Sequence, residues 1–297
     1  MTETARYGSG AASAALLPRV SISEVTLPDL AFEEDVELFA AAGLRGIGIW
    51  ESKIEHVRIE DAVEMLARHG LHATNCVPVG NSVFPYALSP DPVEPACRVE
   101  ELRRRIERLA AVSPECLVII TGPAPDGERA RSLELCRSAF ASLARTACDA
   151  GITLALEPMH PSAAPELCLF DNLVDAGAFL DELDEPGLGL LVDSWHVGQD
   201  PELDASLAAN ASRIAGVHLA DHRAGANGWV DRAFPGEGLG ESRRLIVALE
   251  RVGFSGSLDV EIFSDDGRYG SCVDGSLWRL PAAEIVARAT RFARADS

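Results

Sequence analysis

The chain lacks several features that would place it in other classes of protein. Positive charge is scarce, because 26 Lys and Arg stand against 46 Asp and Glu and leave a net charge of -20. Such a field repels phosphate backbones and anionic lipid headgroups, so we expect no nucleic-acid partner and no membrane partner. No segment approaches the roughly 20 uninterrupted apolar residues that a membrane span needs.

A cysteine pattern is also missing. The seven cysteines are odd in number and contain no C-x-x-C pair, so they indicate neither a disulfide framework nor a zinc knuckle. We expect reduced thiols and a cytoplasmic location. The first residues hold no apolar stretch long enough for a secretory signal. We therefore predict a flexible N-terminal tail over residues 1–18 and a single folded domain over 19–297.

Short apolar runs alternate with longer amphipathic ones along the remaining chain, whose 47% hydrophobic and 24% charged residues suit a globular domain. The expected strands are 20–25, 46–50, 72–79, 116–121, 152–157, 188–193, 216–219 and 258–263. The expected helices are 30–42, 59–69, 94–111, 128–150, 173–183, 203–214, 242–252 and 281–295. Eight such units predict an α/β fold, a (β/α)8 TIM barrel. An open doubly wound sheet is the competing fold, but no G-x-G-x-x-G follows the first strand.

The later strands predict which side chains enter the barrel. In the strand 152–157, bulky residues alternate with a second face that ends in Glu157. The strand 257–262 has the same pattern, with Asp259 and Glu261 on its polar face. In a barrel covered by helices the bulky face meets the helices, so the polar face looks inward. Carboxylates at the ends of such strands then reach the mouth, where active sites of this fold lie.

Four side chains end successive strands in this way, namely Glu157, Asp193, His218 and Glu261. Taken singly, Asp193 fits a helix N-cap and His218 fits a core histidine. Together at one end of the barrel, three carboxylates would repel one another unless a cation lay between them. Three oxygen ligands and one imidazole suit Mn²⁺, Mg²⁺ or Co²⁺. The sequence therefore predicts a divalent metal site.

These residues, with His196 three positions after Asp193, resemble the pattern of the xylose-isomerase-like TIM barrels, the sugar phosphate isomerase/epimerase superfamily. The resemblance covers about residues 20–295. It implies one divalent ion on the four strand-end residues, with Mn²⁺ as first choice and Mg²⁺, Co²⁺ or Zn²⁺ as alternatives. It also implies that His196 contacts the substrate and that Arg232, before Phe-Pro-Gly-Glu-Gly, lies on the substrate side.

Other members of that superfamily are AP endonucleases, whose three-metal site needs extra histidines. Here Ala233 follows the pair Asp231 and Arg232, and the strand 116–121 ends without histidine. We therefore do not expect DNA repair.

Further residues beyond the strand ends are candidate substrate contacts. An apolar wall over a polyol would come from aromatic side chains, for which plain packing is the alternative: Trp50, Trp195, Phe84 and Trp229. His160 and His222 follow ligand strands and are candidate pocket residues. We expect Asp259 to be a buried partner of an arginine or of the backbone. The role of Glu51 stays open.

The activity that these observations and the resemblance imply is a divalent-metal-dependent isomerase or epimerase of a small sugar or polyol ketone. Glu157 and Glu261 would act as base and acid around a metal-stabilised enediolate. The alternative is a metal-dependent dehydratase or lyase on a cyclic polyol ketone of the inosose or dehydroshikimate type. A third reading is a non-catalytic sugar-binding barrel. We expect an unphosphorylated substrate, and a homo-oligomer stays open.

Overall fold

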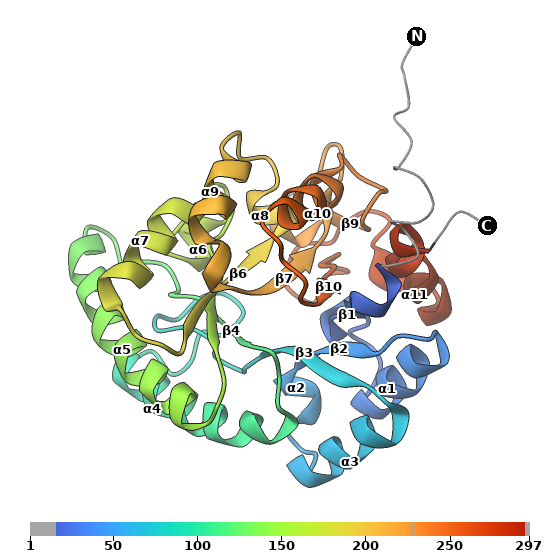
Figure 1. Cartoon of the computed structure of the whole chain (residues 1–297), viewed down its shortest axis with the longest axis horizontal. Helices are drawn as coiled ribbons and strands as arrows, with labels where there is room; N and C mark the ends of the chain where they lie inside the picture. Colours follow the sequence, from blue (N-terminus) through green and yellow to red (C-terminus); the bar gives the residue numbers. More distant parts are fainter. Residues whose placement is uncertain (1–15, 227, 295–297) are drawn as a thin grey trace.

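Parallel strands form the centre of the structure, a computed structural model that describes residues 16–226 and 228–294 (Figure 1). They make one eight-stranded sheet in the order β1-β10-β7-β6-β5-β4-β3-β2. A bridge between Ser23 and Gly48 brings the first and last of these together, so the sheet is a nearly closed barrel. The strands are β1 (Val20–Ile22), β2 (Gly46–Trp50), β3 (His72–Val77), β4 (Leu117–Ile119), β5 (Leu154–Leu156), β6 (Leu188–Asp193), β7 (Ile214–Leu219) and β10 (Leu258–Val260).

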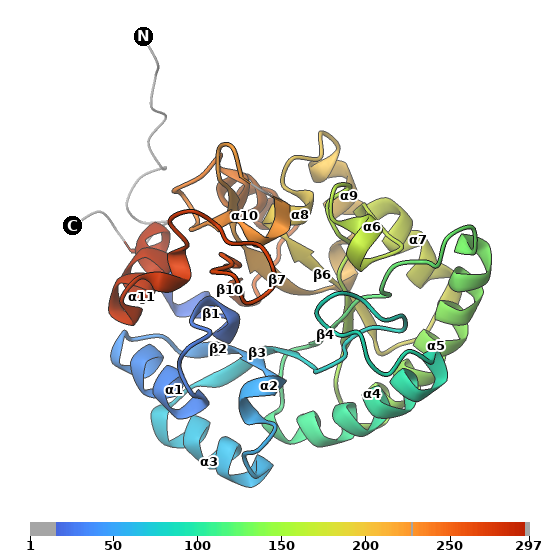
Figure 2. The same cartoon turned by 180° about the vertical axis from the view of Figure 1, so that it is seen from behind.

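A ring of helices surrounds the strands, and Figures 1 and 2 both place the last helix beside the first strand. The eight main helices are α1 (Phe32–Ala41), α3 (Ile59–His69), α4 (Pro95–Leu109), α5 (Arg129–Asp149), α7 (Leu173–Leu183), α9 (Leu203–Asn210), α10 (Glu241–Arg251) and α11 (Ala282–Thr290). Short helices precede three of them, namely α2 (Glu51–Ile54), α6 (Ala164–Leu167) and α8 (Ser194–Val197). The predicted (β/α)8 barrel is confirmed. In its described part no helix has the length and apolar character to cross a membrane.

Two of the three clusters of buried apolar side chains in the described residues lie on opposite faces of the strands. The larger fills the space between strands and helices and includes Leu154 and Leu156. The smaller lies on the opposite strand face and includes Ala155 between them, together with Val77, Cys116, Val118 and Leu191. The alternation therefore divides as predicted, with bulky residues toward the helices and the other face toward the barrel interior.

A register shift between β6 and β7 sets the level of two site residues. Leu190 pairs with Ile214, whereas Asp193 pairs with His218, so β7 holds one extra residue. Without that extra residue Asp193 would lie opposite Val217 and would no longer pair with His218. An irregularity of this kind re-aims side chains, and here it aligns Asp193 with His218 at the mouth.

Two local features differ from the predictions. The helix expected over 203–214 ends at Asn210, and residue 214 already belongs to β7. An unpredicted antiparallel pair, β8 (Asp221–His222) and β9 (Arg232–Ala233), follows β7. At the end of the predicted tail over 1–18, Leu16 and Leu17 are partly buried and pack against the core. The rest of that predicted tail, residues 1–15, lies outside the described residues.

Candidate metal centre and active site

The four strand-end side chains meet at the mouth of the barrel. Glu157 follows β5, Asp193 ends β6, His218 lies in β7, and Glu261 follows β10. One ligand atom from each lies within 4.8 Å of the others, and all four residues are buried. The predicted convergence is therefore present in the structure.

The unpaired atoms of this quartet fit a bound cation. His218 is fully buried, yet neither of its ring nitrogens has a hydrogen-bond partner, and Glu157 Oε1 also lacks one. His218 Nδ1 lies 3.6 Å from Glu157 Oε1 and 3.4 Å from Glu261 Oε2. Buried polar atoms without partners are costly, and a divalent ion would satisfy His218 Nδ1 and Glu157 Oε1 together. Three carboxylates and one imidazole are ligands that divalent cations accept.

The pKa values of Glu157 and His218 are shifted by burial and by the charges of neighbouring members of the quartet. Burial raises the pKa of Glu157 to about 7, and the charges of Glu261 and Asp193 add to that rise. Burial lowers the pKa of His218, but Glu261 and Glu157 outweigh it and raise that pKa well above its usual value. Without an ion, the site therefore holds protons where a cation would lie.

Arg232 is the cation that the structure places against the quartet. It is 2% exposed, and its Nη1 lies 2.8 Å from Asp193 Oδ2 and 3.2 Å from Glu261 Oε2. Its guanidinium also lies over the ring of Phe263, 5.1 Å from the centroid. Burial alone would raise the pKa of Glu261, but the charges of His218 and Arg232 lower it. Arg232 belongs to β9, which pairs with β8.

His196 presents a hydrogen-bond donor toward the same centre. Its Nδ1 accepts a hydrogen bond of 2.9 Å from the backbone N–H of His160. Burial, with the charge of Arg232, lowers the pKa of His196 well below its usual value. A neutral ring that accepts at Nδ1 must carry its proton on Nε2, which lies 3.7 Å from Asp193 Oδ2 and 3.3 Å from Arg232 Nη2. Because a guanidinium only donates, the contact with Arg232 is not a hydrogen bond in this tautomer. The tautomer thus makes Nε2 a donor.

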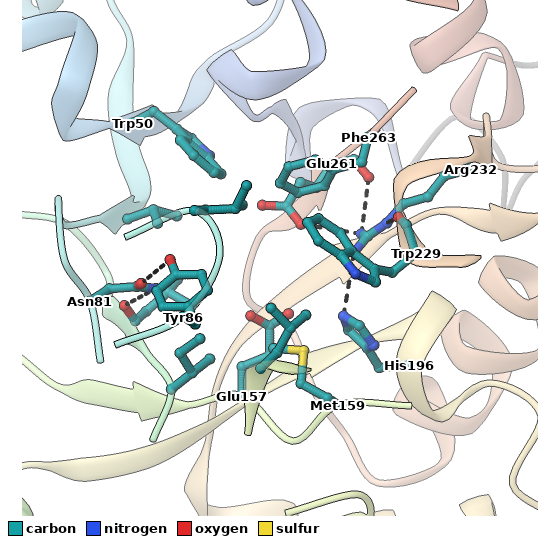
Figure 3. A pocket seen from close by; sticks show the side chains of 15 residues that line it. Trp50, Asn81, Tyr86, Glu157, Met159, His196, Trp229, Arg232, Glu261 and Phe263 are labelled. Carbon is teal, nitrogen blue, oxygen red and sulfur yellow. Dashed lines mark hydrogen bonds and ion pairs between the residues drawn. The ribbon is translucent and has the colours of Figure 1, made fainter. Parts of the chain in front are cut away.

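A cavity of about 50 Å³ is lined by two members of the quartet, Glu157 and Glu261 (Figure 3). Its polar lining consists of Asn81, Tyr86, Glu157, His196, Arg232 and Glu261. Its apolar lining consists of Trp50, Val77, Leu88, Val118, Ile120, Met159, Leu167, Trp229 and Phe263. The polar side chains of the lining can therefore bind a ligand, while the apolar side chains exclude water.

Three predicted substrate contacts do not line this cavity. Trp195 is 2% exposed and stacks on His222 with ring centroids 4.3 Å apart, behind His196. His222 Nδ1 lies 3.3 Å from Glu241 Oε1. His160 lines a separate hollow of about 460 Å³ that also touches His196. Trp195, His160 and His222 thus support His196 from behind, and direct contact with substrate stays a prediction.

Glu51 and Phe84, whose roles the sequence left open, also lie outside the cavity lining. Glu51 is buried between Arg105 and Arg108, at 2.9 and 3.1 Å, and accepts the backbone N–H of Val79. Phe84 is buried in the core. Both stabilise the barrel wall.

The expectation for Asp259 needs correction, because its partner is neither an arginine nor the backbone. Its carboxylate accepts hydrogen bonds from Ser21 Oγ and, at 3.0 Å, from Asn75 Nδ2. Asp259 Oδ2 also lies 3.8 Å from His218 Nε2, on the side of the ring away from the other ligands. Gly48 makes room for it, since a Cβ there would come within 2.2 Å of Asp259 Oδ2. Asp259 therefore supports a ligand.

Asn81 and Tyr86 are cavity residues that the sequence reasoning missed. They lie in the long connection between β3 and α4, where no periodic pattern marks an inward side. The only signal was their place after the carboxyl end of a strand.

Comparison with known proteins agrees with this geometry. The chain is 27% identical over 211 residues to a ketose 3-epimerase of Arthrobacter globiformis, covering 69% of this chain and 68% of the relative. It is 27% identical over 228 residues to an L-ribulose 3-epimerase of Methylomonas sp. (strain DH-1), covering 72% and 74%. An IolI protein crystallised with a zinc atom shares the fold, with a TM-score of 0.74 at 19% identity over 92% of this chain and 96% of that one. The family model of the xylose isomerase-like TIM barrels matches residues 36–295, so the chain belongs to that family.

Proposed function

We propose that this chain is a divalent-metal-dependent epimerase or isomerase of a small ketose or polyol ketone. The observation that carries the proposal is the pair Glu157 and Glu261, which line one cavity from β5 and β10 and also belong to the metal quartet. These strands are separated by β6 and β7, so the two carboxylates approach the cavity from different sides. Two relatives that act as ketose 3-epimerases support the same chemistry.

Epimerisation needs one proton acceptor and one proton donor on opposite faces of a carbon. Glu157 and Glu261 supply these groups on two sides of the cavity. One carboxylate takes the proton from the carbon beside the carbonyl, and the other returns a proton to the opposite face. Their roles exchange when the reaction runs backward. An isomerase would instead return the proton to the neighbouring carbon with the same pair.

His196 and Arg232 hold the substrate oxygens in this proposal. His196 offers its Nε2–H. Arg232 offers those guanidinium N–H groups that are not paired with the carboxylates. Donors fixed in a buried site cost little reorganisation when charge develops on a substrate oxygen. The aromatic side chains of Trp50, Trp229 and Phe263 exclude water from the reacting carbon.

The residues that would hold the divalent ion are Glu157, Asp193, His218 and Glu261. Bound there, the ion supplies the Lewis acidity that lowers the free energy of an enediolate. We propose Mn²⁺ because three of the four ligands are carboxylates. Zinc is the competitor to test, since zinc is bound in the IolI structure.

All seven cysteines of the chain are free. This supports the reducing, cytoplasmic location that we propose.

A panel of ketopentoses, ketohexoses and inososes, incubated with Mn²⁺ in D₂O, tests the proposal. We expect conversion of at least one ketose, with deuterium at the abstracted carbon. Glu157→Gln and Glu261→Gln should each lower kcat by on the order of 10²-fold or more. Glu51→Gln is the control, because Glu51 is buried in the same barrel but does not line the cavity. Wild-type turnover in Glu261→Gln with metal bound would refute the assigned role.

The same panel distinguishes the alternative, a dehydratase or lyase. Loss of water from a cyclic polyol ketone would give an enone that absorbs in the ultraviolet. If the enone formed and no epimer did, the proposed epimerisation would be wrong, but the proposed proton abstraction would stand.

A further inference from the structure

Arg98 fixes the connection between β3 and α4, which forms one wall of the cavity. Arg98 is 1% exposed, and its Nε and Nη2 donate to Ser82 O and Ser82 Oγ at 2.9 and 2.7 Å. It also donates to Ser89 O and Oγ and to the carbonyls of Asp91 and Pro92, at 3.0 to 3.2 Å. One buried guanidinium thus binds the connection at four residues.

The first part of this connection also lies against the end of β4. Ser82 forms a parallel bridge with Ile120, and the Phe84 N–H donates to Thr121 O at 2.8 Å. Gly122 makes this approach possible, since at φ +75° a Cβ would come within 2.3 Å of Phe84 O. The backbone that carries Asn81 and Tyr86 is therefore held from both sides.

Asn81 and Tyr86 form a polar pair in an otherwise apolar wall. Tyr86 Oη donates to Asn81 Oδ1 at 2.8 Å, and Asn81 Nδ2 donates weakly to Val118 O at 3.4 Å. Figure 3 shows the pair across the cavity from Arg232 and His196. The cavity residues around the pair include Val77, Val118 and Ile120, which offer only apolar side chains.

We propose that Asn81 and Tyr86 bind a substrate hydroxyl remote from the reacting carbon and thereby determine specificity. The inference rests on the proposed function, because it takes the substrate to be a ketose or polyol ketone held by Arg232 and His196 at its reacting end. The proton of Tyr86 Oη is donated to Asn81, so the lone pairs of Oη can accept a hydrogen bond from the substrate hydroxyl. Asn81 Nδ2 has a second N–H, which donates to the same hydroxyl oxygen.

Burial keeps this pair in the required state. Burial raises the pKa of Tyr86, so its hydroxyl remains protonated across the physiological range. Because the tyrosine proton goes to Asn81, the pair selects a group that can both donate and accept. A hydroxyl meets that requirement, and a methyl or methylene group does not.

The test compares Tyr86→Phe with the wild type on the best ketose of the panel and on analogues that each lack one hydroxyl. With the parent ketose, Tyr86→Phe should lower kcat/KM about tenfold, mainly through KM. With the one analogue that lacks the recognised hydroxyl, the same substitution should have little effect. Tyr269→Phe is the matched control, because it removes a hydroxyl from a tyrosine that does not line the cavity.

Equal losses on the parent and on every analogue would overturn the inference, and so would no loss at all. Calorimetric binding of the same sugars to the Mn²⁺-loaded proteins separates this result from failure of the proposed function. Binding without turnover would refute the proposed reaction, and the Tyr86 effect would then be measured in Kd. Turnover without a Tyr86 effect would refute this inference alone. Neither binding nor turnover of any sugar would refute both.

Discussion

Metal binding to the quartet should release protons, because the metal-free site holds them where the ion would lie. The neighbouring carboxylates raise the pKa of His218 well above its usual value, so this ring carries an extra proton at pH 7. Burial raises the pKa of Glu157 to about 7, so this carboxyl is about half protonated there. A divalent ion requires neutral imidazole and ionised carboxylates.

The expected release follows from these two groups. His218 contributes one proton and Glu157 about half a proton, which gives about 1.5 protons per ion at pH 7. The logarithm of the apparent affinity should rise with pH at the same slope. Between pH 6.5 and 7.5 the affinity for Mn²⁺ should therefore increase roughly 30-fold. The slope should be steeper below this range, where Glu157 is fully protonated, and shallower above it.

Titration calorimetry in two buffers of different ionisation enthalpy measures the released protons directly. Competition with a chromophoric chelator gives the affinity at each pH. Glu157→Gln should reduce the release to about one proton at pH 7 and remove the change in slope. Glu51→Gln should behave as the wild type. Release below half a proton, or equal release in the wild type and in Glu157→Gln, would refute this reading of the site.

Three further variants test residues outside the quartet. Asp259→Asn should weaken Mn²⁺ binding about 10-fold or more, since the carboxylate faces the far nitrogen of His218; unchanged affinity would show that the ring is oriented without it. Glu24 is buried just after β1 and accepts the backbone N–H of Trp50 at 2.9 Å. Burial raises its pKa, so the folded protein favours the protonated carboxyl, and the free energy of unfolding falls as pH rises through the folded-state pKa. Glu24→Gln should therefore raise the melting temperature at pH 8 by roughly 2–4 °C and change it less at pH 5, whereas Glu51→Gln, which breaks two ion pairs, should lower it at both. Arg232→Lys should reduce kcat/KM by on the order of 10²-fold, because one ammonium does not reproduce the guanidinium fork; equal activity would contradict that assignment.

The convergence of the quartet could be predicted because it depends on repeated, local patterns. Alternation along the strands places Glu157 and Glu261 inward, and the common direction of parallel strands brings their ends together. Neither step needs knowledge of loop structure. The level of Asp193 with His218 is different, since it depends on one extra residue in β7 that no local pattern reveals.

The substrate wall was harder to predict because it is built by contacts distant in sequence. Asn81 and Tyr86 line the cavity because Arg98 and the end of β4 hold the connection that carries them. Trp195 illustrates the opposite case, since its place after a strand suggested a cavity contact, yet stacking on His222 buries it behind His196. Position after a strand indicates proximity to the mouth but does not indicate which side chains face the ligand.

Charge balance at the centre also predicts which sugars the enzyme accepts. Glu157, Asp193 and Glu261 carry three negative charges when a metal is bound, and a divalent ion with Arg232 carries three positive charges. Among residues 16–226 and 228–294 no other arginine or lysine lines the cavity, and His196 is neutral. A phosphate group would add about two uncompensated negative charges to a buried site of a chain that already carries -20. We therefore expect kcat/KM for a free ketose to exceed that for its phosphate ester by at least 10²-fold. Steady-state assays of the two compounds at equal Mn²⁺ measure this ratio, and a preference for the ester would show that the charges of the centre are balanced differently.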